Sequence, residues 1–368
     1  MTKKKEVKMY RHYGAIDIGS NAVRLLIKRL EKTDGKVIGY KELMLRVPLR
    51  LGFDVFKRNK ISKDNARKLS MLIKSFSYLM KIYEVNEYMA CATSAIRDAR
   101  NGKKIIKSIK ERTGIHIHII NGKQEAKGIY KNYTDCVDTS KGNYMYVDVG
   151  GGSTEISMLS DGHLVSTNSY DIGTIRILCN TVEENEWKRM EEDVRSIAER
   201  YTGINIIGSG GNINKLYRLI ENRDKKRQRI SVKSLSDICD LMADMSVEER
   251  VVKLGLKYDR ADVIVPAGTI FLSISEQAKA KYIYVPTIGL ADGMINILLE
   301  NDSNKYKVNK DDEEKEDDDK CDGVDAGVQE DEKDEELPTV NDEMETVETD
   351  SSEEDEETPD EEEVTEEK

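Results

Sequence analysis

Two short segments of the sequence carry the same pattern of residues that could bind phosphate together with a cation. Residues 15–21 read AIDIGSN and residues 146–155 read YVDVGGGSTE, so Asp17 and Asp148 occupy equivalent places. Each Asp follows a β-branched run and precedes a Gly turn, where backbone N–H groups can approach an anion closely. Two such turns facing each other would bind a phosphate chain and the metal that accompanies it.

A third Gly-rich segment, residues 208–212 with the sequence GSGGN, lies at an expected strand-to-helix junction. Its glycines Gly210 and Gly211 could present free N–H groups beside a helix N-terminus, where anions bind well. A plain tight turn before a helix is the alternative.

The elements that would position these turns follow the same order twice. In the first half we expect strands at 14–19, 22–30, 36–40, 43–47, 88–92 and 115–120, and helices at 63–83, 95–112 and 123–132. Asp34-Gly35 is typical of a hairpin turn, and Ser62 of a helix N-cap.

In the second half we expect strands at 144–149, 154–159, 163–170, 204–207 and 282–285, and helices at 174–180, 186–200, 211–221, 233–244, 246–254, 262–280 and 290–300. The duplicated order predicts an α/β protein with two actin-like (ribonuclease H-like) domains and a cleft between them. The first domain would cover 10–125, and helix 290–300 is a candidate to pack back onto it. The second domain would cover 126–289.

The charge is divided unevenly along the 368 residues. The net charge is -12, but residues 311–368 hold 32 Asp and Glu against 4 Lys, which leaves the first 310 residues at +16. We expect the acidic segment 304–368 to be disordered, because it has too few apolar residues to form a core. A basic body suits a polyanionic ligand, although an ordinary Lys-rich surface would look the same.

The remaining composition argues for a reduced, cytoplasmic protein. The five Cys residues form no C-x-x-C pair, and no run of 18 apolar residues occurs. His116 and His118 alternate with Ile and lack a third ligand nearby, so we interpret them as structural. We expect neither a nucleic acid nor a membrane as a partner, and a homodimer stays open.

Taken together, the motifs resemble the exopolyphosphatase and guanosine pentaphosphate phosphatase family over about residues 13–300. The resemblance rests on six segments in order, namely 15–21, 92–97 (ATSAIR), 124–126 (QEA), 147–155, 208–212 and 289–293 (GLADG). It implies hydrolysis of the terminal phosphoanhydride of polyphosphate or of guanosine pentaphosphate, with Mg²⁺ or another divalent cation.

The resemblance also implies roles for individual residues. Glu125 would activate water, Glu155 would assist it or hold the metal, and Asp148 with Asp17 would lie on the metal side. The residues implied in phosphate binding are Ser20, Asn21, Thr93, Ser94, Arg97, Gly150, Gly151, Gly152, Ser153, Gly210 and Gly211.

Several alternatives stay open from the residues alone. Glu125 could be a helix N-terminal carboxylate, Arg97 a surface ion pair and Glu155 a solvent-facing strand residue. Gln124 and Ala22 depart from the Glu and Ser that relatives often carry. Besides an exopolyphosphatase, the candidates are a guanosine pentaphosphate phosphohydrolase, a non-catalytic polyphosphate or nucleotide sensor, and a kinase or chaperone ATPase of the same fold.

Overall fold

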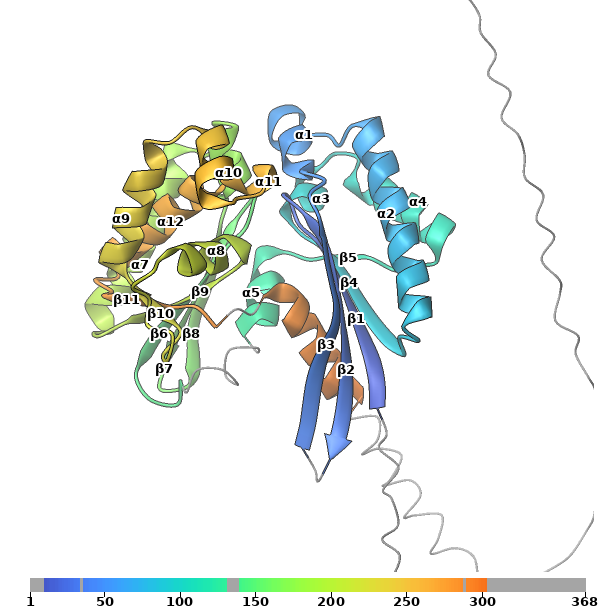
Figure 1. Cartoon of the computed structure of the whole chain (residues 1–368), viewed down its shortest axis with the longest axis horizontal. Helices are drawn as coiled ribbons and strands as arrows, with labels where there is room; N and C mark the ends of the chain where they lie inside the picture. Colours follow the sequence, from blue (N-terminus) through green and yellow to red (C-terminus); the bar gives the residue numbers. More distant parts are fainter. Residues whose placement is uncertain (1–9, 34–35, 131–138, 287–288, 303–368) are drawn as a thin grey trace, which may run out of the picture. The chain divides into compact units, whose positions relative to one another are not determined.

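A computed structural model describes residues 10–302 of the chain except 34–35, 131–138 and 287–288 (Figure 1). Its first sheet has five strands in the order β3-β2-β1-β4-β5. Strands β1 to β3 are antiparallel, whereas β4 and β5 run parallel to β1. The strands are β1 (Tyr10–Ile18), β2 (Val23–Thr33), β3 (Lys36–Val47), β4 (Glu87–Ala92) and β5 (His118–Ile119).

The second sheet repeats this plan, with one strand added at the edge. Its order is β10-β11-β9-β6-β7-β8, and β6, β7 and β8 correspond to β1, β2 and β3. The strands are β6 (Asn143–Val149), β7 (Thr154–Ser160), β8 (His163–Tyr170), β9 (Asn205–Ser209), β10 (Arg229–Ser231) and β11 (Tyr282–Tyr284). The predicted duplication of an actin-like α/β plan is therefore confirmed.

Helices pack on both sheets (Figure 1). In the first half they are α1 (Leu51–Arg58), α2 (Lys63–Ile82), α3 (Ser94–Asp98), α4 (Gly102–Thr113) and α5 (Gly122–Tyr130). In the second half they are α6 (Thr174–Leu178), α7 (Glu184–Arg200), α8 (Gly211–Leu219), α9 (Val232–Ala243), α10 (Val247–Leu254), α11 (Tyr258–Ala261) and α12 (Ile264–Gln277).

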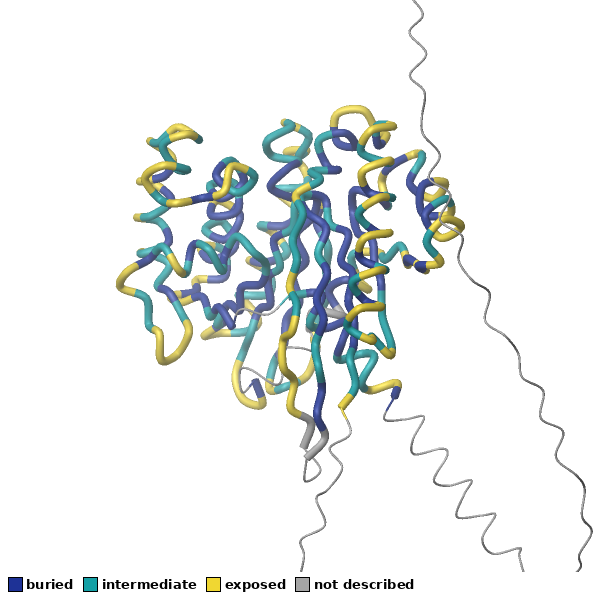
Figure 2. Tube along the Cα trace, turned by 45° about the vertical axis from the view of Figure 1, so that its right-hand side comes forward, coloured by how far each residue is buried: buried dark blue, intermediate teal, exposed yellow. Residues whose placement is uncertain are grey.

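Helix α2 shows how the sequence pattern becomes packing. It begins at Ser62, whose side chain accepts a hydrogen bond from the Asn65 N–H at 3.2 Å, as the N-cap prediction requires. Leu69, Ile73 and Phe76 recur at helical spacing and are buried in the core of the first half. Figure 2 shows the buried residues following the strands and one side of the helices.

The helix over residues 290–302 packs between the two sheets. Its Leu290, Met294 and Ile295 share one core cluster with Tyr13 of β1 and with Tyr146 of β6. In Figure 1 it is the orange helix beside β3 and α5. Which domain it belongs to, and the boundaries 10–125 and 126–289, stay predictions.

Several boundaries differ from the sequence prediction for local reasons. The expected strands 36–40 and 43–47 are one strand, β3, whose register against β2 shifts between Ile27 and Lys28. The helix expected over 95–112 is two helices, because Ala99 has an extended backbone (φ -71°, ψ 126°). Likewise the helix expected over 262–280 begins at Ile264, and α11 precedes it.

Other elements were missed or shortened. The prediction lacked α1 and β10, and the strand expected over 115–120 is only the two residues of β5. Residues 304–368, the turn 34–35 and the end of the helix predicted over 123–132 lie outside the described residues. None of the helices in the described ranges has the length and apolar character needed to cross a membrane.

Candidate active site

The two predicted turns have the same backbone geometry. In the turn between β1 and β2, the Gly19 N–H donates to the Ala22 carbonyl at 3.1 Å. In the turn between β6 and β7, the Gly150 N–H donates to the Ser153 carbonyl at 2.9 Å. Each turn closes a hairpin whose first strand ends just after an Asp. The two halves therefore share equivalent backbone hydrogen bonds in these turns as well as the same order of strands.

The two turns also lie in direct contact. A Cβ built on Gly151 would be 3.0 Å from the Ser20 Cβ, and one built on Gly152 would be 2.3 Å from the Ser94 Oγ. Ser20 and Ser94 share a hydrogen bond of 2.8 Å between their hydroxyls. A side chain at either position would therefore crowd the loop of the other half, most of all at Gly152, because the loops of the two halves touch there.

The third turn, between β9 and α8, adds a glycine with a left-handed backbone. Gly210 has φ +100°, and a Cβ there would lie 3.0 Å from the Asp148 Oδ1. The turn thus brings the start of α8 beside the end of β6. This arrangement fits the predicted anion-binding turn, with Asp148 as its acidic neighbour.

Three carboxylates converge near these turns. Glu125 of α5, Asp148 of β6 and Glu155 of β7 each offer an oxygen, and these oxygens lie within 4.8 Å of one another. Glu125 and Glu155 are only 8% and 3% exposed. The Oε2 atom of each is buried and has no hydrogen-bond partner within the described part of the chain. Glu155 is therefore not a solvent-facing strand residue, and Glu125, although it lies in the first turn of α5, is buried in this cluster.

Local structure explains why Glu125 points inward. Helix α5 starts with reciprocal hydrogen bonds of 2.9 Å, from the Asn121 N–H to the Gln124 side chain and from the Gln124 N–H to the Asn121 side chain. A Cβ on Gly122 would be 2.2 Å from the Ser169 Oγ, so α5 packs closely on β8. Gln124 therefore caps the helix and leaves the next residue to face the cluster.

Burial, together with nearby negative charge, raises the pKa of the carboxyl groups in this cluster. Burial, and then the charges of Glu155 and Asp148, raise the pKa of Glu125 well above its usual range. Burial raises the pKa of Glu155 to about 8, with Asp148 adding to the shift, although Ser169 donates a hydrogen bond of 2.9 Å to Glu155. Burial also raises the pKa of Asp148 to about 6.

Asp17 has a different environment from Asp148. Its carboxylate accepts a hydrogen bond of 2.5 Å from the Arg24 guanidinium, with which it forms an ion pair. Asp17 and Arg24 lie opposite each other on β1 and β2, and Asp148 and Glu155 lie opposite each other on β6 and β7. The same register position is therefore basic in one hairpin and acidic in the other.

A cavity of about 180 Å³ lies among these elements. Twelve of the predicted site residues line it, namely Asp17, Ser20, Asn21, Thr93, Ser94, Glu125, Asp148, Gly150, Gly151, Ser153, Gly210 and Gly211. Glu155 belongs to the carboxylate cluster at its edge.

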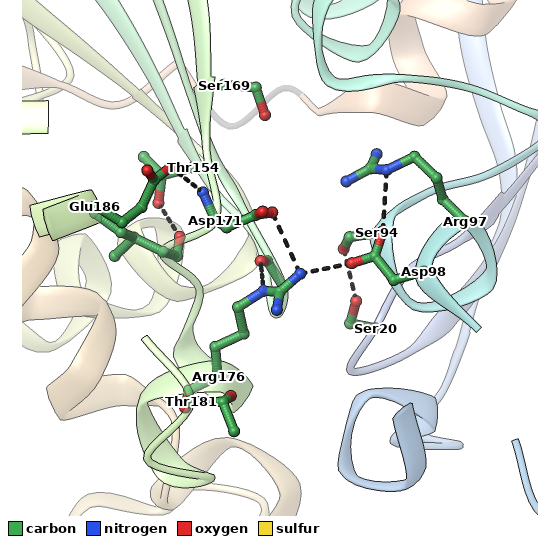
Figure 3. A network of polar contacts seen from close by, with 12 residues as sticks. Ser20, Ser94, Arg97, Asp98, Thr154, Ser169, Asp171, Arg176, Thr181 and Glu186 are labelled. Carbon is green, nitrogen blue, oxygen red and sulfur yellow. Dashed lines mark hydrogen bonds and ion pairs between the residues drawn. The ribbon is translucent and has the colours of Figure 1, made fainter. Parts of the chain in front are cut away.

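Two predicted phosphate-binding residues do not line the cavity. Arg97 donates to the Ile120 carbonyl at 3.3 Å and pairs with Asp98 at 3.3 Å (Figure 3). Gly152 is packed against Ser94, and its carbonyl accepts a hydrogen bond of 2.6 Å from Arg176. Neither residue lines the cavity in this structure, and their roles in phosphate binding stay predictions.

Sequence reasoning missed the basic side of the cavity. Arg24, Lys41, Arg46 and Arg260 all line it, and none of them belongs to a segment that we singled out. The signal for Arg24 was present, since it follows Asp17 by the same seven residues that separate Asp148 from Glu155.

Arg260 is the most unusual of these cations. Burial, followed by the charges of Arg46 and Arg24, lowers its pKa to about 10. Its guanidinium donates to the Asn212 side chain at 3.2 Å, and it has no ion pair among the residues described. A Cβ on Gly211 would be 2.8 Å from its Nη1 atom. A half-buried cation that forms no ion pair with a described residue, beside a Gly-rich turn, is an environment that an anionic ligand would complete.

The fold and site define an actin-like α/β protein whose paired turns face a cavity with one acidic and one basic side. Residues 43–302, more than half of the chain, match the Ppx/GppA phosphatase family, and the chain belongs to that family. The resemblance found in the motifs is thereby confirmed.

Individual relatives agree with this assignment. The chain is 26% identical over 314 residues to a bifunctional 3-dehydroquinate synthase/phosphatase of Fusobacterium nucleatum, covering 79% of this chain and 46% of that protein. It is 30% identical over 166 residues to exopolyphosphatase 1 of Mycobacterium tuberculosis, covering 45% and 47%. The chain thus spans about half the length of these curated relatives.

Solved structures show the same fold. The crystal structure of the Aquifex aeolicus member of the Ppx/GppA family has a TM-score of 0.63 at 25% identity, covering 80% of this chain and 99% of that one. An exopolyphosphatase from Cytophaga hutchinsonii has a TM-score of 0.70 at 20% identity, covering 79% and 98%. Both support two actin-like halves in this chain.

Proposed function

We propose that this protein is a metal-dependent exopolyphosphatase, which hydrolyses the terminal phosphoanhydride of inorganic polyphosphate and releases orthophosphate. The observation that carries the proposal is the meeting of Glu125, Asp148 and Glu155 at a cavity whose other walls are Gly turns and arginines. Phosphoanhydride hydrolysis needs an oriented water, a group that accepts its proton, and positive charge around the transferred phosphate.

Glu125 is the general base of the proposed reaction. It lines the cavity, and its buried Oε2 atom has no partner among the described residues. Its raised pKa makes it a stronger proton acceptor than an ordinary carboxylate once it is ionised. Its rigid place at the start of α5 would hold the attacking water in line with the terminal phosphate.

Asp148 and Glu155 would hold the divalent cation. Oxygen-rich sites suit Mg²⁺, and the unpartnered Glu155 Oε2 atom beside two further carboxylates fits a cation better than it fits an empty core. A bound cation would neutralise charge on the phosphate oxygens. We had also expected Asp17 as a metal residue; its ion pair with Arg24 favours the Asp148 side for the ion.

The phosphate chain would lie against the turns and the basic side of the cavity. Ser20 and Asn21 line the cavity from the first turn, and Gly151 and Ser153 line it from the second. The Arg260 guanidinium lies next to Gly211 and forms no ion pair in the described ranges, since neighbouring Asp259 pairs with Arg46. Together they would position a polyanion without reading any chemical group other than phosphate.

Guanosine pentaphosphate is the second candidate substrate, and similarity to one relative favours it. The chain is 23% identical over 306 residues to a guanosine-5'-triphosphate,3'-diphosphate pyrophosphatase of Vibrio parahaemolyticus, covering 78% of this chain and 59% of that protein. A cytoplasmic location, a homodimer and independence from nucleic acid remain predictions from the sequence.

One comparison of substrates tests the proposal. Phosphate release is measured from polyphosphate, guanosine pentaphosphate and ATP, side by side with magnesium, for the wild type and for Glu125→Gln. Glu125→Gln should bind substrate but lower turnover about 10²- to 10⁴-fold, because it keeps the shape and loses the base. Glu111→Gln, at an exposed position of α4, is the matched control.

The outcomes separate the candidates clearly. Fastest release from polyphosphate supports the exopolyphosphatase, and fastest release from guanosine pentaphosphate supports the second candidate. Binding without any release in the wild type would identify a sensor. Wild-type turnover in Glu125→Gln would remove Glu125 from the role of base.

A further inference from the structure

The Arg176 side chain connects the β6–β7 turn to two helices of the first half. It is 14% exposed, and its Nη2 atom forms an ion pair of 2.5 Å with Asp98 of α3 (Figure 3). Its Nε atom donates to the Gly152 carbonyl at 2.6 Å. The guanidinium also stacks on the Phe56 ring of α1, with 4.2 Å between its Cζ atom and the ring centre. Arg176 lies outside the sequence motifs described above.

All three carbonyls of the Gly150–Gly152 turn are held on the side of α6. The Thr174 N–H donates to Gly150 at 3.1 Å, and the Ile175 N–H donates to Gly151 at 2.8 Å. Gly152 is beyond the reach of these backbone donors, and the Arg176 side chain holds its carbonyl instead. The backbone of α6 therefore donates to two of the three turn carbonyls, and the Arg176 side chain donates to the third.

This arrangement leaves the amides of the turn available. Within the described ranges the Gly151 N–H makes no hydrogen bond to the chain, and Gly151 lines the cavity, which Gly152 does not. A glycine peptide rotates readily, because glycine lacks the Cβ that restricts other residues. Without a donor on the α6 side, the Gly152 carbonyl could turn toward the cavity and present a negative dipole to an approaching phosphate.

The second arm of Arg176 sets the distance between the two halves at this point. Asp98 lies on the same short helix as Ser94, which hydrogen-bonds Ser20 of the first turn. Asp98 also pairs with Arg97, so one carboxylate holds both arginines. A change at Arg176 would thus move the second turn relative to the first, where they already touch.

We propose that Arg176 is a positioning residue for phosphate binding, which holds the Gly152 carbonyl away from the cavity and fixes the Gly150–Gly152 turn against α3 through Asp98. It does not touch the substrate itself. The inference rests on the proposed function, since it assigns the turn amides to the phosphates of that substrate.

Steady-state kinetics of the full chain with inorganic polyphosphate and magnesium test this inference. Arg176→Gln should raise KM about tenfold and change kcat less than about threefold, because it loses a charge-assisted hydrogen bond that serves binding. Arg176→Lys keeps the charge without the planar fork and should fall between the wild type and Arg176→Gln. Asp98→Asn should raise KM about threefold.

Asp171→Asn is the matched control. Asp171 is a 65% exposed second acidic partner of Arg176, 3.2 Å from its Nη2 atom, and its loss should leave KM unchanged. Unfolding temperature is measured for every variant, because a merely structural role would lower it and kcat together. An unchanged KM in both Arg176→Gln and Asp98→Asn would overturn the inference, as would equal effects of Asp98→Asn and Asp171→Asn.

Binding of inorganic triphosphate, measured by calorimetry, separates this inference from the proposed function. If the wild type releases no phosphate from polyphosphate, the proposed function is wrong. The dissociation constant for triphosphate then decides the role of Arg176, and a value that is unchanged in Arg176→Gln and Asp98→Asn rejects it. If the wild type hydrolyses polyphosphate, KM decides in the same way.

Discussion

The β1–β2 hairpin and the β6–β7 hairpin share one backbone plan and carry opposite charge. In both, an Asp is the last residue but one of the first strand, and the residue seven positions later lies opposite it on the second strand. That residue is Arg24 in the first hairpin and Glu155 in the second. The first Asp is thus neutralised by an ion pair, and the second faces another carboxylate.

In the proposed reaction this difference would divide the roles between the two halves. A neutralised Asp has little need of a cation, and the arginine that pairs with it adds positive charge to the cavity wall. A pair of facing carboxylates, joined by Glu125, is unstable alone and is completed by a cation or a proton. Both turns would contact the phosphate chain, but the side chains at this register position suit the phosphate in the first hairpin and the metal and the water in the second.

The largest expected effect separates the two aspartates directly. Asp148→Asn should raise the magnesium concentration for half-maximal activity about 100-fold, because it removes a proposed ligand. Asp17→Asn should change that concentration less than about threefold. Titration of activity with magnesium in both variants measures the difference, and equal shifts would refute the division of roles.

The sequence predicted the duplicated order and most strands because both depend on local patterns. β-Branched runs, Gly turns and the Ser62 cap are visible within a few residues. The cavity residues in those motifs, such as Asp148 and Gly210, were found for the same reason. The continuous β3 and the break at Ala99 were missed, because a bulge and a single extended residue leave no periodic signal.

The basic side of the site was missed for a different reason. Arg260 acts through its position in space, on α11, next to a turn about 50 residues earlier in the chain. Its significance comes from burial beside other cations, which no sequence window displays. Arg97 is the converse case, because its motif position predicts phosphate contact while its side chain contacts Asp98 and the Ile120 carbonyl, so this role stays a prediction.

A smaller effect is expected on the basic side. Arg260→Gln should raise KM for polyphosphate about tenfold, because a charged hydrogen bond to phosphate is lost, and should leave the magnesium requirement unchanged. Arg218→Gln, at an exposed position on α8, is the control and should leave KM as it is. A raised magnesium requirement in Arg260→Gln would show that the acidic and basic sides are not separate.

The smallest effect concerns stability, and the two hairpins should give opposite signs. Asp17→Asn breaks an ion pair and leaves Arg24 without its partner, so the unfolding temperature should fall by a few degrees. Glu155→Gln removes a buried charge from a crowded cluster, so at pH 8 without divalent cations the unfolding temperature should rise by a few degrees.

The pH dependence follows from the direction of the Glu155 shift. Its pKa is about 8 in the folded protein, against an ordinary value of 4.5 expected in the unfolded chain. Between these values the folded state binds more protons, so the wild type loses stability as pH rises through this window. The advantage of Glu155→Gln should therefore be absent below pH 4.5, grow up to about pH 8, and shrink when magnesium is added, because the cation stabilises the wild-type cluster. Thermal unfolding of the wild type and Glu155→Gln across a pH series, with and without magnesium, measures this difference in stability. A difference that is constant with pH would mean that ionisation of Glu155 does not destabilise the folded protein.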